Sequence, residues 1–392
     1  MAWARNTTVL RGFVLVGFGY FLAWQAAVVF EAPHRATMAL AIHGFVFHVI
    51  FGKGYALIPS YFDRELAFDL GPMIHLPLTV LGTVGLTLGP VAGASELESL
   101  GAVAWGAGGA IFLITILATV RDNVVGRETG TGEANRHRRA VDQLANAFVP
   151  VALFYLAVGS YETVALHTAL PGVIGSHAGL SHVLAAGTAG LLVLTIGARL
   201  LPRFMVAEPP LLFVLFMLPA GALGPWVIAT HLRGGLLFRI GATLQAVAIV
   251  SYAIVVLVLF RRSDRRRVGL YGVALGAIAG IVAVLLGLAM AFEYEPIVLS
   301  VIHHRFTLLG FLGLTIIGVS FQFYPPGIGT LPAVGDRTAA IGLGSLATGL
   351  LLELVGTIGS LEPMVLAGSG LTFGAAAAIC YVLFGVVLER GL

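Results

Sequence analysis

The chain has 392 residues, of which 58% are hydrophobic and only 10% are charged, and its formal net charge is +3. Soluble domains carry about 25% charged residues, so this composition excludes a soluble globular protein and indicates one that lies in a lipid bilayer. The single cysteine, Cys380, excludes a disulfide framework and a thiolate metal cluster. The small net charge gives no reason to expect a nucleic-acid partner.

Twelve apolar runs follow one another along the chain, and each reaches the length of about 20 residues that a spanning helix needs. They cover residues 8–31, 36–60, 68–90, 99–120, 142–165, 174–200, 209–230, 238–260, 269–291, 297–323, 338–357 and 364–388. Continuous runs of this length predict helices rather than barrel strands. We therefore predict an all-α integral membrane protein, in contact with lipid, that forms a single domain over residues 1–392.

The arginines predict the orientation of these spans. The side that holds both termini carries most of them, whereas the opposite side carries only Arg35, Arg233 and Arg239. Cytoplasmic loops are enriched in arginine and lysine, so we predict a multi-pass protein of the plasma membrane with both termini in the cytoplasm.

The twelve spans fall into three groups of four, which we interpret as repeats over about residues 1–125, 138–262 and 266–392. Each group begins with a helix that ends in an aromatic–glutamate pair, and a histidine-bearing helix follows. These pairs are Phe30-Glu31, Tyr161-Glu162 and Tyr294-Glu295. Because each group has an even number of spans, the repeats are parallel, and they predict a pseudo-threefold ring of helices. The polar loop 121–139 is expected to be a flexible connection.

Five histidines are predicted to share one layer in the outer third of the membrane. Their depths follow from a rise of about 1.5 Å per residue along each helix. The five are His43, His177, His182, His303 and His304. An imidazole in hydrocarbon is costly, so an intramembrane histidine indicates a functional site.

The spacing of these histidines favours ligands drawn singly from different helices. Successive residues differ by about 100° around a helix, so His303 and His304 point in different directions and can serve two centres. His177 and His182 are five residues apart and cannot both face one point. This pattern is typical of haem ligation rather than of a chelate formed by one helix.

Two stretches resemble the catalytic subunit of the haem–copper oxidases. HGFVFHVIFGKGYALIP, which begins at His43, is similar to helix II of that family, and VIHHRFTLLGFLGLTIIGVSFQFYPP, which contains His303 and His304, is similar to helix X. The resemblance implies that His43 and His304 are the axial pair of a low-spin haem b. It also implies that His303 is a ligand of a second centre, which we assign together with His177 or His182 to a second haem or to a metal such as copper or iron.

The chain also departs from that family. Its span 209–230 offers only His231, just beyond its outer end, where the oxidases place copper ligands, and the arginine pair that holds haem propionates is absent. Arg35, Arg233, Arg239 and Arg305 are the substitutes we consider as partners of the propionates. In these respects the chain is more similar to the NnrS-type twelve-helix haem proteins linked to nitric oxide metabolism.

Two classes of function follow. The first is a haem protein, an oxidoreductase, sensor or electron-transfer module, which takes electrons from a quinol or an external carrier protein and acts on a small gaseous ligand such as nitric oxide or oxygen. The alternative is a proton-coupled transporter whose histidines relay protons. The position of the histidines away from the membrane midplane favours the haem protein.

Overall fold

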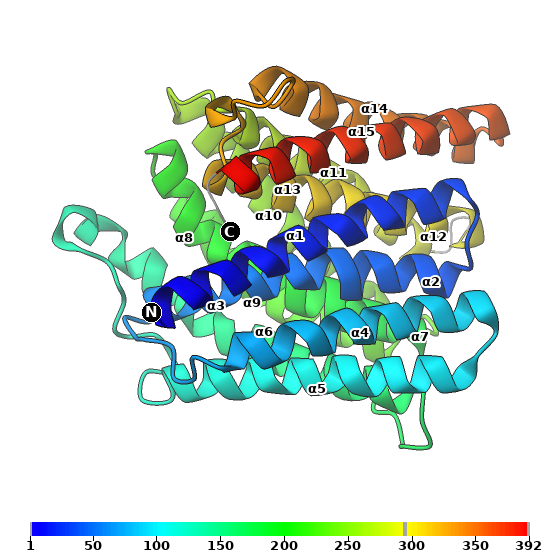
Figure 1. Ribbon diagram of the computed structural model, residues 1–392, viewed down its shortest axis with the longest axis horizontal. Coiled ribbons are helices and arrows are strands. Elements are labelled where there is room, and N and C mark those ends of the chain that lie inside the picture. The colour runs from blue at the N-terminus through cyan, green and yellow to red at the C-terminus, as the bar shows by residue number, and fades with distance from the viewer. Residues whose placement is uncertain (1, 293–295, 390–392) are drawn as a thin grey trace.

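A computed structural model describes residues 2–292 and 296–389, and over this part of the chain the protein consists of helices, with no strand. Twelve helices are long and apolar enough to cross a membrane, so the predicted fold class is confirmed (Figure 1). In chain order the elements are α1 (Ala2–Val29), α2 (His34–Met38), η1 (Ala39–Val46), α3 (Phe47–Tyr61), α4 (Gly71–Ala92), α5 (Ser95–Val120), η2 (Glu133–Arg138), α6 (Arg139–Ala165), α7 (His177–Ser181), η3 (His182–Gly190), α8 (Leu191–Met205), α9 (Leu211–Thr230), α10 (Leu236–Arg262), α11 (Val268–Ala291), α12 (Pro296–Arg305), η4 (Phe306–Gly313), α13 (Leu314–Phe323), η5 (Pro326–Ile328), α14 (Asp336–Ile358) and α15 (Glu362–Glu389).

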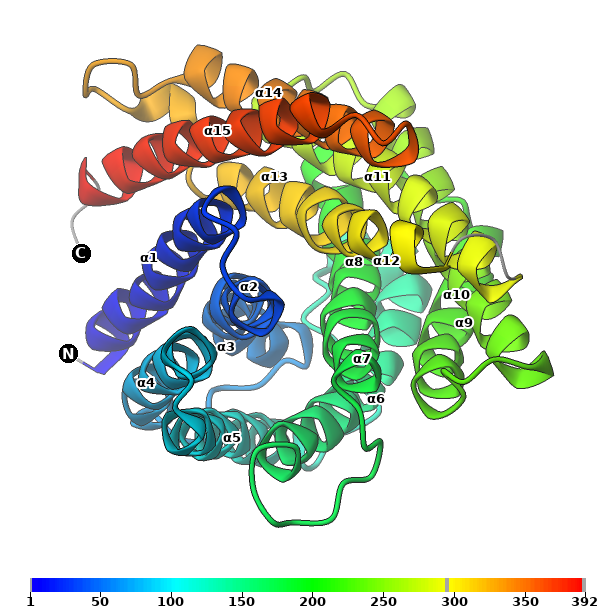
Figure 2. The ribbon, with the colours of Figure 1, turned by 90° about the vertical axis from the view of Figure 1, so that its right-hand side faces the viewer.

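Three spans run through the middle of the bundle, and we call them the central helices. Each is an α-helix that continues through a π-helical stretch into a second α-helix: α2–η1–α3, α7–η3–α8 and α12–η4–α13. Their apolar windows are 78%, 78% and 83% buried, against 39–56% for the other nine spans. The three π-helical stretches contact one another in pairs, and Figure 2 shows the central helices inside the others. Since π-helical turns are frequent at functional sites, the region where the three π-helical stretches meet is a candidate for such a site.

The remaining spans surround the central helices. The hairpins α4–α5, α9–α10 and α14–α15 alternate with the single helices α1, α6 and α11, and α15 packs against α1 to close the ring. Single helices and hairpins thus alternate around the central helices, whereas the division of the chain into three repeats stays a prediction.

The aromatic–glutamate pairs differ from one another. The Glu162 carboxylate accepts backbone N–H groups of the loop after α6, at 2.6–3.1 Å from the nitrogen atoms of Val173, Ile174 and Gly175. Glu31 is exposed, and the pair Tyr294-Glu295 lies outside the described residues. Glu162 thus fixes a loop, a role that Glu31 does not share.

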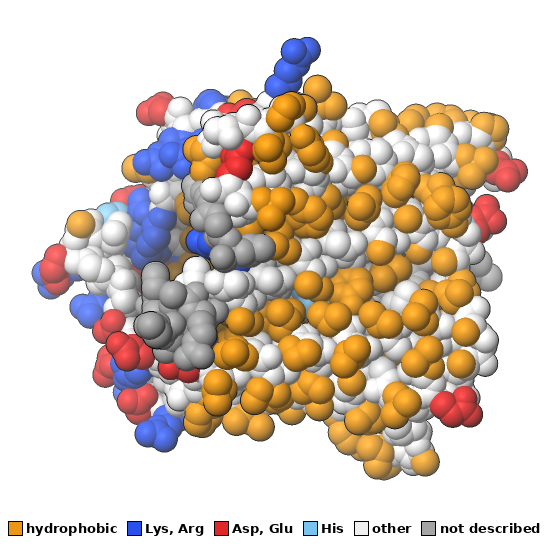
Figure 3. Space-filling view, viewed as in Figure 1, with side chains coloured by type: hydrophobic (Ala, Val, Ile, Leu, Met, Phe, Trp, Pro, Cys, Tyr) orange, Lys and Arg blue, Asp and Glu red, His pale blue; other side chains and the backbone are white. Residues whose placement is uncertain are grey.

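The surface separates into an apolar middle and two polar ends. Figure 3 shows hydrophobic side chains over the length of the bundle, with arginine and lysine gathered at the end where α1 begins. Figure 1 places both chain termini at this end. We call the opposite end the outer end.

Contacts join the loop 121–139 to the connection between α3 and α4, and its flexibility stays a prediction. Arg64 pairs with Asp122 at 3.0 Å and with Glu128 at 2.7 Å, and the Asn123 amide donates to the Phe62 carbonyl at 3.0 Å. The Arg64 guanidinium holds the pKa of the Asp122 carboxyl below its usual value. Two acids of the loop thus neutralise an arginine on the neighbouring connection.

The third central helix approaches α11 closely enough that a side chain at the contact is excluded. A Cβ atom on Gly318 would lie 2.5 Å from the Gly269 carbonyl oxygen and 2.7 Å from the Val273 nitrogen. We therefore expect Gly318→Ala to destabilise the protein by about 1–3 kcal/mol, as overpacking does. Gly344→Ala is the matched control, because a Cβ there meets no atom within 4 Å. Thermal unfolding in detergent measures both, and equal Tm values for the two variants would contradict the expectation.

Candidate functional site

Two neighbouring cavities lie between the central helices near the outer end. The large cavity, of about 570 Å³, is bounded by the second and third central helices and by α10 and α11. The small cavity, of about 280 Å³, lies between the three central helices and the outer end of α5. His304 lines both cavities, so the two sites share a wall.

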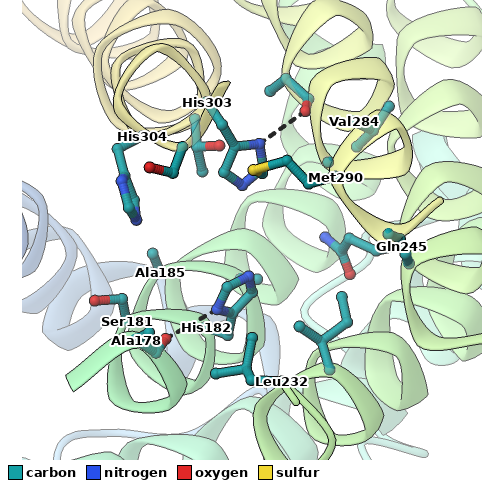
Figure 4. A pocket seen from close by; sticks show the side chains of 18 of the residues that line it. Ala178, Ser181, His182, Ala185, Leu232, Gln245, Val284, Met290, His303 and His304 are labelled. Atoms are coloured by element: carbon teal, nitrogen blue, oxygen red, sulfur yellow. Dashed lines mark hydrogen bonds between the residues drawn. The ribbon is translucent and has the colours of Figure 1, made fainter. Parts of the chain in front are cut away.

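His182 and His303 face one another across the large cavity. Figure 4 shows the two rings directed toward each other from η3 and α12. Their centroids are 6.4 Å apart and their planes differ by 21°. A metal ion that accepts a nitrogen lone pair from each side, at about 2.0–2.1 Å per bond, suits rings at this separation.

The hydrogen bonds of these two rings fix which nitrogen is available. The Nδ1 atom of His182 lies 2.9 Å from the Ala178 carbonyl, and the Nδ1 atom of His303 lies 2.9 Å from the Ala283 carbonyl. A carbonyl oxygen only accepts, so each Nδ1 carries the proton and donates it. Each Nε2 therefore keeps its lone pair, which is the state of a histidine that ligates a metal.

The rest of the large cavity is apolar apart from a few side chains. Its apolar walls come from α10, α11 and η4 and include Phe238, Ile249, Val284, Leu308 and Phe311. Gln245 on α10 reaches into it, and the exposed Arg233 lines its outer end. A volume of this size lies within the range of about 300–1,000 Å³ that is typical of cofactor and ligand sites.

His43 lies in the wall of the small cavity with one nitrogen available. Its Nε2 atom is 3.4 Å from the Thr163 hydroxyl, which itself donates to the Gly159 carbonyl at 2.8 Å and so accepts from His43. The Nδ1 atom then carries the lone pair, and among the described residues this buried atom has no hydrogen-bond partner. Trp105 fixes the ring from the side, with centroids 4.6 Å apart.

Histidines and an ion pair complete the small cavity. His34 lies beside His304, with ring centroids 5.6 Å apart, and His177 lies beside His167 at 5.4 Å. Arg35 also lines this cavity, but its Nη1 atom pairs with the Glu98 carboxylate at 2.8 Å. Half of the Arg35 side chain remains exposed, so this pair lies at the outer margin of the cavity.

Of the predicted residues, Arg239 and Arg305 line neither cavity, and Arg305 lies in an ion pair inside the bundle. Its guanidinium makes two bonds of 2.7 Å to the Glu353 carboxylate and donates to Gln25 and Thr372, each at 3.1 Å. It lines neither cavity. Because Glu353 neutralises its charge inside the bundle, Arg305 is not available as a partner of a cofactor in these cavities.

The structure thus separates the predicted residues into two sets. His182 and His303 belong to the large cavity, whereas His43 and His177 belong to the small one, with His304 between them. Sequence reasoning missed Gln245 and Glu98. An isolated amide within the apolar run 238–260 is a signal that could have identified Gln245.

Comparison with known proteins gives no assignment. No protein-family model matches the sequence, and no curated protein is significantly similar to it. Within the described residues, no three histidine, cysteine or acidic side chains are arranged to hold a metal ion by themselves.

Proposed function

We propose that the protein is a haem-binding integral membrane protein in which His182 and His303 hold the iron in the large cavity. The observation that carries this proposal is the pair of facing imidazoles, whose centroids are 6.4 Å apart and whose Nδ1 atoms are both engaged by carbonyls. Neutral imidazole is a standard axial ligand of haem iron. Two protein ligands are enough for a haem, because the porphyrin supplies the remaining four nitrogen atoms.

The residues around the pair have separate roles in this proposal. The Ala178 and Ala283 carbonyls orient the two rings and increase their basicity as ligands. The apolar walls keep water away, and Arg233 offers a positive charge to the propionates near the outer end. A bound haem supplies a reversible one-electron change. Ligation from both sides favours electron transfer as the basic activity, with nitric oxide or oxygen chemistry as its extension.

The second part of the proposal rests on the sequence analysis. His43 and His304 are the proposed axial pair of a haem in the small cavity, with His177 beside them, and they define a second centre. The resemblance to the haem–copper oxidase superfamily, and to NnrS-type proteins in particular, supports haem in this layer. We also propose a plasma-membrane location, cytoplasmic termini, and electrons supplied by a quinol or an external carrier protein.

Haem content tests the proposal directly. The protein purified from cells supplied with a haem precursor is expected to show a Soret band and at least one haem per chain. The His43→Ala, His304→Ala double variant tests whether the protein has one haem centre or two. A fall in haem content from two per chain to one supports both sites. Protein that folds but carries neither haem nor iron would overturn the proposal.

A further inference from the structure

Five arginines lie close together where α10 passes into α11. The segment 261–267, RRSDRRR, contains the last two residues of α10 and the whole connection to α11, and we call it the basic connection. All five arginines are exposed, and Asp264 is the one acid among them. Figure 3 shows arginine and lysine side chains at one end of the bundle, next to its apolar middle. Orientation in the membrane accounts for positive charge at one end of a protein, but not for the way these five charges are arranged.

The protein does not neutralise the basic connection. In the described part of the chain, the arginines that form ion pairs at this end are Arg64, Arg199 and Arg203. None of these belongs to the basic connection. An arginine that lacks a carboxylate partner within the protein is suited to bind an anion from outside it, and phosphate is the anion that its planar fork of N–H groups matches best.

Backbone carbonyls hold two of these guanidinium groups in place. Arg262 donates to the Glu208 carbonyl at 3.1 Å, and Arg265 donates to the Phe204 carbonyl at 3.4 Å. Both therefore lie against the end of α8 and its connection to α9, while the Glu208 carboxylate faces His137 at 3.8 Å. A carbonyl oxygen carries no net charge, and each guanidinium keeps further N–H groups available. The arrangement thus presents positioned, positively charged donors.

Apolar side chains border the basic connection on the neighbouring helices. Leu211 and Leu212 at the start of α9 are 49% and 60% exposed, and Tyr271 in the first turn of α11 is 44% exposed. Tyr271 packs against Phe260 of α10, with ring centroids 5.2 Å apart, so the rim is continuous with both helices. A tyrosine at this depth is typical of the membrane–water interface. Charge and apolar surface lie next to one another here, as phosphate and acyl chains do in a phospholipid.

We propose that the basic connection binds the phosphate of an anionic phospholipid, whose acyl chains lie on Leu211, Leu212 and Tyr271. This inference is independent of the proposed haem function. The apolar rim favours a lipid over a soluble phosphate or a nucleic acid, neither of which has a group that would cover it. Since the arginines contact α8 as well as continuing α10, a lipid bound to them joins the two helices and is expected to raise Tm.

Phosphatidylglycerol added to the full-length protein in a neutral detergent is the probe, and native mass spectrometry measures its affinity. Arg265→Gln is expected to weaken binding about five-fold, the contribution of one arginine near an anionic headgroup. With Arg262→Gln and Arg266→Gln added, the loss is expected to be on the order of a hundred-fold. Arg64→Gln is the matched control, because it removes the same charge at the same end. Two carboxylates of the loop 121–139, at 3.0 and 2.7 Å, already neutralise Arg64, so lipid affinity should change by less than about two-fold.

The remaining comparisons decide what the basic connection recognises. Arg265→Lys keeps the charge and should retain most of the affinity, whereas a loss equal to that of Arg265→Gln would overturn the role of the charge. Equal affinity of the wild type for phosphatidylcholine with the same acyl chains would overturn the preference for an anion. Inorganic phosphate that displaces the lipid at equal concentration would assign the site to a soluble anion, and an oligonucleotide that binds more tightly would assign it to a nucleic acid. Either result overturns the proposal and leaves the proposed haem function untouched.

Discussion

Replacing His303 with alanine is expected to remove the haem from the large cavity. Loss of a group that merely supports a ligand lowers metal affinity about 10–100-fold, and loss of the ligand itself lowers it at least as much. We therefore expect less than about a tenth of the wild-type haem to remain in this cavity. His303→Met is expected to keep the haem and to raise its midpoint potential, because methionine–histidine ligation has that effect.

The control for His303→Ala is a substitution of a histidine that lies outside both cavities. His137 lies in η2, ahead of α6 and away from the outer end, and His137→Ala should leave the spectrum and the haem content unchanged. Haem content is measured after purification at equal protein concentration, and the folded fraction by size-exclusion chromatography. A His303→Ala variant that is folded and keeps the complete Soret band of the wild type would show that the facing pair holds no haem.

Much of the fold could be predicted from the sequence because bilayer thickness imposes the length of each span. Twelve apolar runs gave twelve helices for this reason. The direction of His303 toward the span of His182 could also be predicted from the sequence. Helix periodicity turns adjacent residues about 100° apart, so His303 and His304 point in different directions.

The rest depended on contacts between helices that are distant in sequence. Nothing in the run around Arg305 shows that Glu353, on another helix, neutralises it. The π-helical stretches were equally hidden, because they arise where three central helices meet and not from a local motif. The assignment of Gln245 to the large cavity likewise required the packing of α9 against α10.

The buried pair Arg305–Glu353 supports the second prediction with a large expected effect. Both side chains are less than a tenth exposed, and the bonds between them join the third central helix to α14. Removal of one partner leaves a buried charge unpaired, which typically costs about 3–5 kcal/mol. We therefore expect Glu353→Ala to lower the free energy of unfolding by about that amount in denaturant titrations in detergent.

A double variant distinguishes a structural pair from a cofactor partner. Arg305→Met with Glu353→Leu removes both charges, and a well-packed apolar replacement of a buried pair is often neutral or stabilising. Most of the lost stability should return, and the haem content should equal that of the wild type because Arg305 lines neither cavity. An exposed pair offers a control: Glu128→Ala removes a 65% exposed side chain that pairs with Arg64, and it is expected to change stability by less than about 1 kcal/mol. If the double variant were stable but had lost its haem, Arg305 would hold a propionate after all, and the ion pair with Glu353 would describe the protein only before haem binds.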